Sequence, residues 1–172
     1  MEIIFKPIGY VRTKFNDDEV KEHHPYGVEA EIEILKEYGE ALDGIDGFSH
    51  IILIFFMHKV TDEQRVTLKA RHRRLVNLGF KLEELPLVGV FCLDSPHRPN
   101  PIGLTIVKLL ERRGCTLKVE GADAFDGTPI LDIKPYTPDR CIRNIELPPW
   151  LMSLMEELKK RGISTEKTYT YF

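Results

Sequence analysis

The sequence predicts a mainly β protein, a small β-barrel or rolled antiparallel sheet with a C-terminal α-helix. Short apolar or alternating segments, separated by turns rich in glycine, proline and aspartate, fill most of residues 2–136. Only the segment after Pro149 has apolar residues at helical spacing. Six or more strands with one clear helix indicate a rolled or closed sheet that carries a helix.

Two segments give the clearest strand signals. Residues 28–34 alternate apolar and acidic side chains, which is typical of a half-buried strand. Residues 50–58 are apolar on both faces and indicate a central, buried strand that lies between His50 and His58. An Asp-Gly pair at Asp126 predicts a tight turn. Further strands are expected over residues 2–13, 85–93, 102–113, 115–125 and 128–136.

Two segments do not follow strand patterns. Residues 61–80 are polar and basic, and they predict either a helix or a long loop. In the tail, Pro149 suits a first helical position and Gly162 can end the helix. The apolar residues between them lie at helical spacing: Leu151, Leu154, Met155 and Leu158.

Length and composition favour a single reduced, cytoplasmic domain. The chain has 172 residues, a formal net charge of -3 and three cysteines that form no CxxC pair. This argues against a disulfide framework, a zinc ribbon and a general attraction to nucleic acid. The longest apolar run, residues 51–57, is much shorter than the roughly 20 residues that a membrane span needs. We therefore expect no membrane association.

A proline-rich corner, SPHRPNP, occupies residues 95–101. Proline restricts its own φ angle and holds the preceding residue in an extended conformation. Ser95, Arg98 and Asn100 each precede a proline, so the corner is expected to be stiff. It either holds Arg98 and Asn100 beside a ligand or only ends a strand.

Carboxylates gather around the turn at Asp126, with Asp123 before it and Asp132 after it. They suit a ribose, an amine or a metal, although aspartates at turns also bind their own backbone. No HExxH or paired Cys/His spacing is present, so we expect no metal. Among the histidines, His58 is the best site candidate because it ends a buried strand. The sequence also has no GxGxxG or GxxxxGK[ST] motif, which excludes Rossmann and P-loop nucleotide sites.

Basic residues concentrate within positions 65–74, a stretch without acidic residues. Contact with RNA phosphates is one reason for such a concentration, and a solvated surface is the other. The candidate RNA-binding residues are Arg65, Lys69, Arg71, Arg73 and Arg74.

Two strings carry a family resemblance. GVFCLDSPHRPNPIGLT and GADAFDGTPILDIKPY closely resemble the signature segments of the TsaA-like family, also known as the TrmO family of tRNA methyltransferases. GIDGFSHIILIFFMH and PIGYVRTKF are similar to its earlier segments. The resemblance spans roughly residues 7–137. It therefore implies a TsaA-like β-barrel methyltransferase domain over residues 1–137 and a C-terminal helical extension, residues 138–172, packed on the same domain.

The resemblance implies an activity and its partners. The barrel would bind S-adenosylmethionine without a Rossmann fold, as a homodimer with the cofactor near the subunit interface. The reaction would transfer a methyl group to the exocyclic nitrogen of threonylcarbamoyl-adenosine, next to the tRNA anticodon. A methyltransferase with a different acceptor and a non-catalytic RNA-binding barrel are the alternatives.

The resemblance also implies site residues. Asp126 and His97 are the candidate bases for the acceptor nitrogen, and Arg98 is the charged residue of the signature loop. Two departures predict altered cofactor or RNA contacts: Asp94 stands where family members commonly carry arginine, and residues 22–24 replace a Pro-Arg-Gln-like cofactor segment. The positions that match cofactor contacts are His58, Lys59, Leu104, Asp123, Ala124, Phe125 and Asp126.

Overall fold

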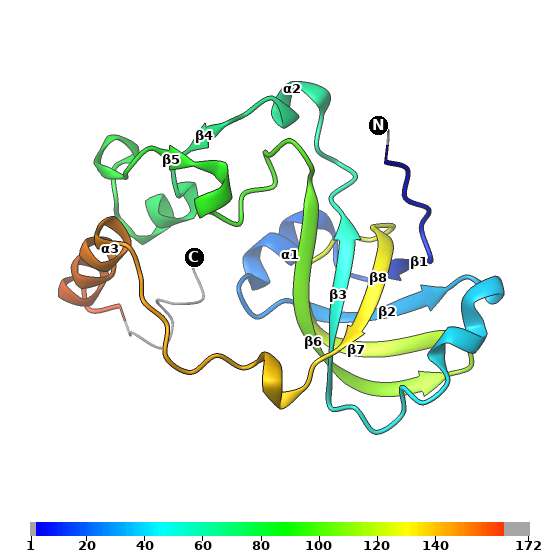
Figure 1. Cartoon of the computed structure of the whole chain (residues 1–172). Helices are drawn as coiled ribbons and strands as arrows, with labels where there is room; N and C mark the ends of the chain where they lie inside the picture. Colours follow the sequence, from blue (N-terminus) through cyan, green and yellow to red (C-terminus); the bar gives the residue numbers. More distant parts are fainter. Residues whose placement is uncertain (1–2, 164–172) are drawn as a thin grey trace. The chain divides into compact units, whose positions relative to one another are not determined.

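The computed structural model describes residues 3–163 and divides the chain into two compact units (Figure 1). The first unit runs to Val60 and resumes from Pro101 to Arg140. The second unit contains Thr61–Asn100 and continues from Cys141. The extension predicted from residue 138 therefore begins near the end of the first unit. Its segment from Cys141 shares the second unit with residues 61–100.

A closed antiparallel barrel forms the first unit, with strands in the order β1-β2-β7-β6-β3-β8. A short helix, α1 (Asp17–His23), follows the first strand, and two 3-10 helices, η1 (Lys36–Leu42) and η5 (Pro138–Arg140), complete the unit. The predicted barrel is confirmed. Its strands are β1 (Gly9–Arg12), β2 (Val28–Ile34), β3 (His50–Phe56), β6 (Ile102–Arg113), β7 (Thr116–Ala122) and β8 (Pro129–Pro135).

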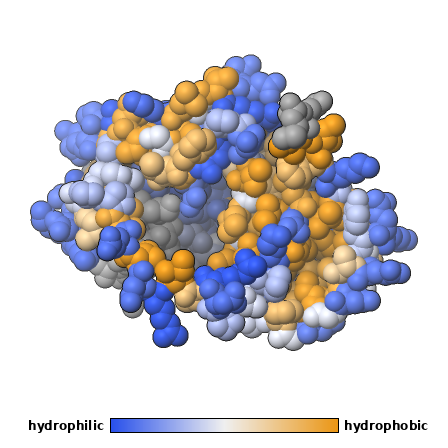
Figure 2. Space-filling view, in the orientation of Figure 1, coloured by the Kyte–Doolittle hydropathy of each residue, from blue (hydrophilic) through white to orange (hydrophobic). Residues whose placement is uncertain are grey.

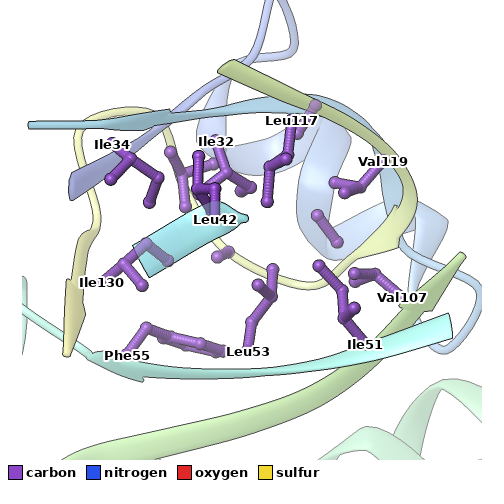
Figure 3. Close-up of a cluster of buried hydrophobic side chains, with 14 residues drawn as sticks. Ile32, Ile34, Leu42, Ile51, Leu53, Phe55, Val107, Leu117, Val119 and Ile130 are labelled. Carbon is purple, nitrogen blue, oxygen red and sulfur yellow. The ribbon is translucent and has the colours of Figure 1, made fainter. Parts of the chain in front are cut away.

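Apolar patterning in the sequence places the barrel core. Along β2, buried and exposed residues alternate without exception, as the sequence predicts. The apolar strand β3 is largely buried, as predicted, and pairs with both β6 and β8. Figure 3 shows core side chains meeting inside the barrel. The buried cluster comprises Val11, Ala30, Ile32, Ile34, Leu42, Ile51, Leu53, Phe55, Val107, Leu117, Val119, Ala122, Ala124 and Ile130.

Gly103, within the PNPIGLT string, has a packing role in this barrel. It lies opposite Phe55 in the β3–β6 ladder. A Cβ atom at this position would collide with the Phe55 ring. Because Phe55 is buried, the glycine allows the start of β6 to approach the core closely.

The second unit is built from short elements and the C-terminal helix α3 (Pro149–Lys160). This helix begins at the predicted proline and ends before Gly162, which has a positive φ of 77°. Its core contains Leu75, Phe80, Leu85, Leu154 and Leu158, so residues 61–100 pack with α3. The other elements are α2 (Asp62–Arg65), β4 (Lys69–Ala70), η2 (Arg73–Leu78), η3 (Leu82–Glu84), β5 (Val88–Gly89) and η4 (Val90–Cys92).

The strand predicted over residues 85–93 is wrong for most of its length. Only Val88–Gly89 is a strand, and a 3-10 turn follows at once over Val90–Cys92. Arg98 donates hydrogen bonds from Nη2 to the backbone oxygens of Val90 and Leu93. These bonds stabilise the turn in place of the predicted strand. The sequence pattern predicts the burial of Val90 and Leu93, which the structure has, but not the turn.

Candidate functional site

The end of β3 and the start of β6 place three of the predicted cofactor residues. Beyond β3, His58 and Lys59 lie in a turn that the Val60 amide closes onto the Met57 oxygen at 3.2 Å. The Met57 amide also donates to the oxygen of Pro101, just before β6, at 2.8 Å. Leu104 on β6 is 64% exposed, between the partly buried Gly103 and Thr105. These bonds fix the turn and leave an apolar side chain available on the outside of the barrel.

The loop between β7 and β8 supplies the remaining predicted cofactor residues. Ala124 is buried and holds the loop on the barrel. The Thr13 amide donates to Oδ1 of Asp126 at 3.0 Å, and the Gly127 amide donates to the Val11 oxygen at 2.9 Å. Gly127 has a φ of 75°, which confirms the predicted Asp-Gly turn. Asp126 therefore binds the backbone beyond the end of β1, at Thr13.

Helix α1 and the residue after it contact predicted cofactor residues of both segments. The Lys59 ammonium lies 2.6 Å from both carboxylate oxygens of Asp17 and 5.0 Å from the centre of the Phe125 ring. Nζ of Lys21 lies 5.8 Å from the same ring. At the other end of the helix, Nε2 of His24 lies 3.7 Å from Oδ2 of Asp123. The structure thus brings Lys59 to Phe125, which lies far from it in the sequence, and His24 to Asp123 in the same loop.

His58, in the turn after β3, has a lowered pKa. Burial lowers the pKa of His58 below its ordinary value of 6.5, and the adjacent Lys59 charge lowers it further. The more distant Asp17 acts in the opposite direction with a smaller effect. The lowered pKa of His58 reduces the positive charge beside the Lys59–Asp17 pair.

Residues 95–100 of the proline corner belong to the second unit, and Arg98 is engaged locally. Nη2 of Arg98 donates to the Val90 oxygen at 2.7 Å and also to the Leu93 oxygen. Its Nε is buried and has no hydrogen-bond partner among residues 3–163. The His97 amide donates to Oγ of Ser95 at 3.3 Å. Of the three predicted catalytic residues, Asp126 belongs to the first unit, whereas His97 and Arg98 belong to the second.

Comparison with known proteins identifies the family. Residues 10–140 match the sequence model of the tRNA-methyltransferase O N-terminal domain. The chain therefore belongs to the TrmO family. A probable S-adenosyl-L-methionine-binding protein of Pyrococcus abyssi is 35% identical, over 92% of this chain and 81% of that protein. A similar relative in Methanothermobacter thermautotrophicus is 40% identical, over 81% of this chain and 93% of its own length.

Two TrmO relatives carry more specific names. The mouse tRNA (adenine(37)-N6)-methyltransferase is 33% identical over 80% of this chain, which covers only 31% of the mouse protein. The crystal structure of TrmO from Pseudomonas aeruginosa matches with a TM-score of 0.62 and 29% identity, over 85% of this chain and 62% of that one. The fold and the family predicted from the signature strings are confirmed, and the predicted cofactor is the one that the archaeal relatives are named for.

Within this TrmO-family chain, the basic stretch separates into exposed and engaged residues. Lys69, Arg73 and Arg74 are exposed. Arg71 donates from Nη1 to the Leu85 oxygen, and Nη1 of Arg65 lies 3.2 Å from Oδ1 of Asp62. The first three residues are therefore the better placed for RNA phosphates, and their role in binding stays a prediction.

The sequence analysis does not identify α1, or Asp17 and Lys21, with which the helix contacts predicted cofactor residues. His24 enters it only within residues 22–24, the segment that departs from the family pattern. A signal for the helix exists in the sequence. Asn16 accepts from the Glu19 amide while the Glu19 carboxylate accepts from the Asn16 amide, a capping box readable as N-x-x-E.

Two findings for the described residues concern metal binding and membrane-crossing helices. Between residues 3 and 163, no three His, Cys, Asp or Glu side chains gather in a way that could hold a metal ion. Within the same range, no helix has the length and apolar character needed to cross a bilayer.

Proposed function

We propose that this protein is an S-adenosylmethionine-dependent tRNA methyltransferase that acts on the exocyclic N6 of adenine 37, carrying a threonylcarbamoyl group, next to the anticodon. The observation that carries the proposal is that α1 and the residue after it contact predicted cofactor residues from two segments of a TrmO-family barrel: Asp17 pairs with Lys59, which lies near Phe125, and His24 lies near Asp123. The partner is tRNA, and the protein would act in the cytoplasm.

The residues present suit this cofactor. The Asp123 side chain is 37% exposed and can accept hydrogen bonds from ribose hydroxyl groups. The Lys59 ammonium lies at cation–π distance from the Phe125 ring. A ring that attracts an ammonium can also attract a sulfonium, which is a cation too. When bound, S-adenosylmethionine supplies a methyl carbon attached to a positively charged sulfur.

The main contribution of the chain to such a displacement is positioning. The loop of Asp123 and Phe125 is fixed by backbone bonds to β1, and the turn of Lys59 is fixed by Met57. The acceptor nitrogen loses one proton as it gains the methyl group. We assign this proton to Asp126 or His97, with Asp126 acting through its second oxygen because Oδ1 binds the Thr13 amide.

The direct experiment uses the purified chain, S-adenosylmethionine and tRNA that carries threonylcarbamoyl-adenosine. Mass spectrometry of the digested nucleosides should show one added methyl group on this nucleoside. The same tRNA without the threonylcarbamoyl group is the control and should gain none. Methylation of the control instead would favour a different acceptor, and no methylation with intact RNA binding would favour a non-catalytic RNA-binding barrel.

The exposed face of β6 supports the proposal of a homodimer. Ile102, Leu104 and Ile106 alternate along the outside of this strand and are all exposed. Figure 2 shows apolar residues gathered over this part of the barrel. Exposed apolar patches of this kind mark interaction sites. Light scattering should give a dimer at micromolar concentration, and Ile106→Glu should give a monomer.

A further inference from the structure

Two lysines share the Phe125 ring, and each is paired with an acid of α1. Lys59 lies 5.0 Å and Lys21 5.8 Å from the ring centre. Nζ of Lys59 lies 2.6 Å from both carboxylate oxygens of Asp17, and Nζ of Lys21 lies 2.8 Å from Oδ1 of Asp18. The surroundings of the ring therefore contain two cations and two neighbouring acids.

The two ion pairs differ in their exposure to water. The Asp17 side chain is 39% exposed, whereas that of Asp18 is 85% exposed. Water screens an exposed pair strongly, so removing the charge of Asp18 changes the field at the ring little. Removing the charge of Asp17 leaves the Lys59 ammonium uncompensated close to the ring.

The position of Asp17 is fixed by the local structure. Asn16 and Glu19 form a capping box at the start of α1, and Val20 is buried beneath the helix. Asp17 is the residue directly after the cap, so its carboxylate is held by the capped first turn of the helix. The pair with Lys59 joins this turn to a residue 42 positions later in the chain.

We propose that Asp17 is a specificity-determining counter-ion, which neutralises Lys59 so that the site prefers the sulfonium cofactor to its neutral thioether product. The inference rests on the proposed function, because it takes Lys59 and Phe125 as cofactor contacts. A sulfonium is a cation, so an uncompensated Lys59 ammonium repels it. S-adenosylhomocysteine has no charge at sulfur and is not repelled there. The lowered pKa of the adjacent His58 is consistent with a site that limits its own positive charge.

Calorimetry with both ligands tests this inference. Asp17→Asn preserves the shape of the side chain and removes its charge, so it should weaken S-adenosylmethionine about tenfold and change S-adenosylhomocysteine less than about twofold. Asp18→Asn is the matched control and should change neither affinity. Asp17→Glu should keep the ratio of the two affinities. In the double variant Asp17→Asn with Lys59→Gln, the ratio should return toward that of the unchanged protein.

The outcomes separate this inference from the proposed function. Equal weakening of both ligands by Asp17→Asn, with an unchanged ratio, would overturn the counter-ion role and leave only a structural one. Unchanged affinities would overturn it as well. If the unchanged protein binds neither ligand, the proposed function fails together with the inference. Melting temperatures of the variants show whether α1 is still folded.

Discussion

Charged side chains have different partners in the loop at Asp123 and in the proline corner. In the loop of the first unit, Asp123 and Phe125 contact ionisable side chains from α1 and from the end of β3. In the corner of the second unit, the guanidinium of Arg98 binds the backbone of its own neighbourhood. A charged residue in a signature string is therefore not always a ligand contact. It can instead hold the loop that carries other contacts.

The largest effect is expected at Arg98. Replacing it with alanine removes the donor to two buried residues, Val90 and Leu93. Leaving buried carbonyl oxygens unsatisfied should lower the free energy of unfolding by about 3 kcal/mol. Arg98→Lys should recover only part of this loss, because an ammonium lacks the planar fork. Urea unfolding measures both variants.

Arg73→Ala is the control for this change. Arg73 is exposed, so its loss should alter the free energy of unfolding by less than about 0.5 kcal/mol. If Arg98→Ala keeps full stability but abolishes methylation, Arg98 is a ligand contact, one of the two roles that the sequence leaves open for this corner. The contrast between the loop and the corner then does not hold.

The next effect is expected at Asp123, and it concerns binding. Asp123→Asn should reduce the affinity for S-adenosylmethionine about tenfold, because a charged hydrogen-bond acceptor for the ribose is lost. The free energy of unfolding should change little, because the Asp123 side chain is partly exposed and its distance to His24 is long for an ion pair, 3.7 Å. Calorimetry and urea unfolding together separate the two quantities.

Asp132→Asn is a matched control for Asp123. Its carboxylate pairs with Lys134 on the same strand and lies outside the loop. Cofactor affinity should therefore be unchanged. A loss at Asp132 as large as that at Asp123 would show that general charge, and not a specific contact, governs binding.

The sequence predicted the barrel well because its signals are local and periodic. The alternation of β2 and the apolar run of β3 determine which faces are buried. It did not predict that residues 61–100 pack with α3, because that core joins short apolar segments far apart in the chain. For the candidate site, the family strings supplied Lys59, Asp123 and Phe125. They could not supply Asp17 or His24, whose roles depend on contacts across the fold.

A smaller effect is expected at the exposed basic residues of the second unit. If Arg73 and Arg74 contact phosphates, replacing both with alanine should reduce the salt slope of tRNA binding by about 1.5 units. Affinity should fall for all tRNAs alike, since phosphate contacts carry no sequence information. Cofactor affinity should stay unchanged. The measurement is a titration with tRNA at several salt concentrations.

Arg113→Ala is the control for the salt slope. This residue is exposed at the end of β6 in the barrel unit and pairs with Glu111 at 2.6 Å. Arg113→Ala should leave the salt slope of tRNA binding unchanged. An unchanged slope in the Arg73 and Arg74 variant would identify the basic stretch as a solvated surface.

The smallest effect is a pH dependence that arises at His58. Its folded pKa lies below the ordinary value of 6.5, chiefly because of burial and then because of Lys59. Between the two pKa values the unfolded chain binds more protons, so stability rises with pH across this window and is level above 6.5. His58→Gln should remove this part of the rise. Urea unfolding from acidic to neutral pH compares the two proteins, and an identical rise in both would show that His58 is not the group responsible.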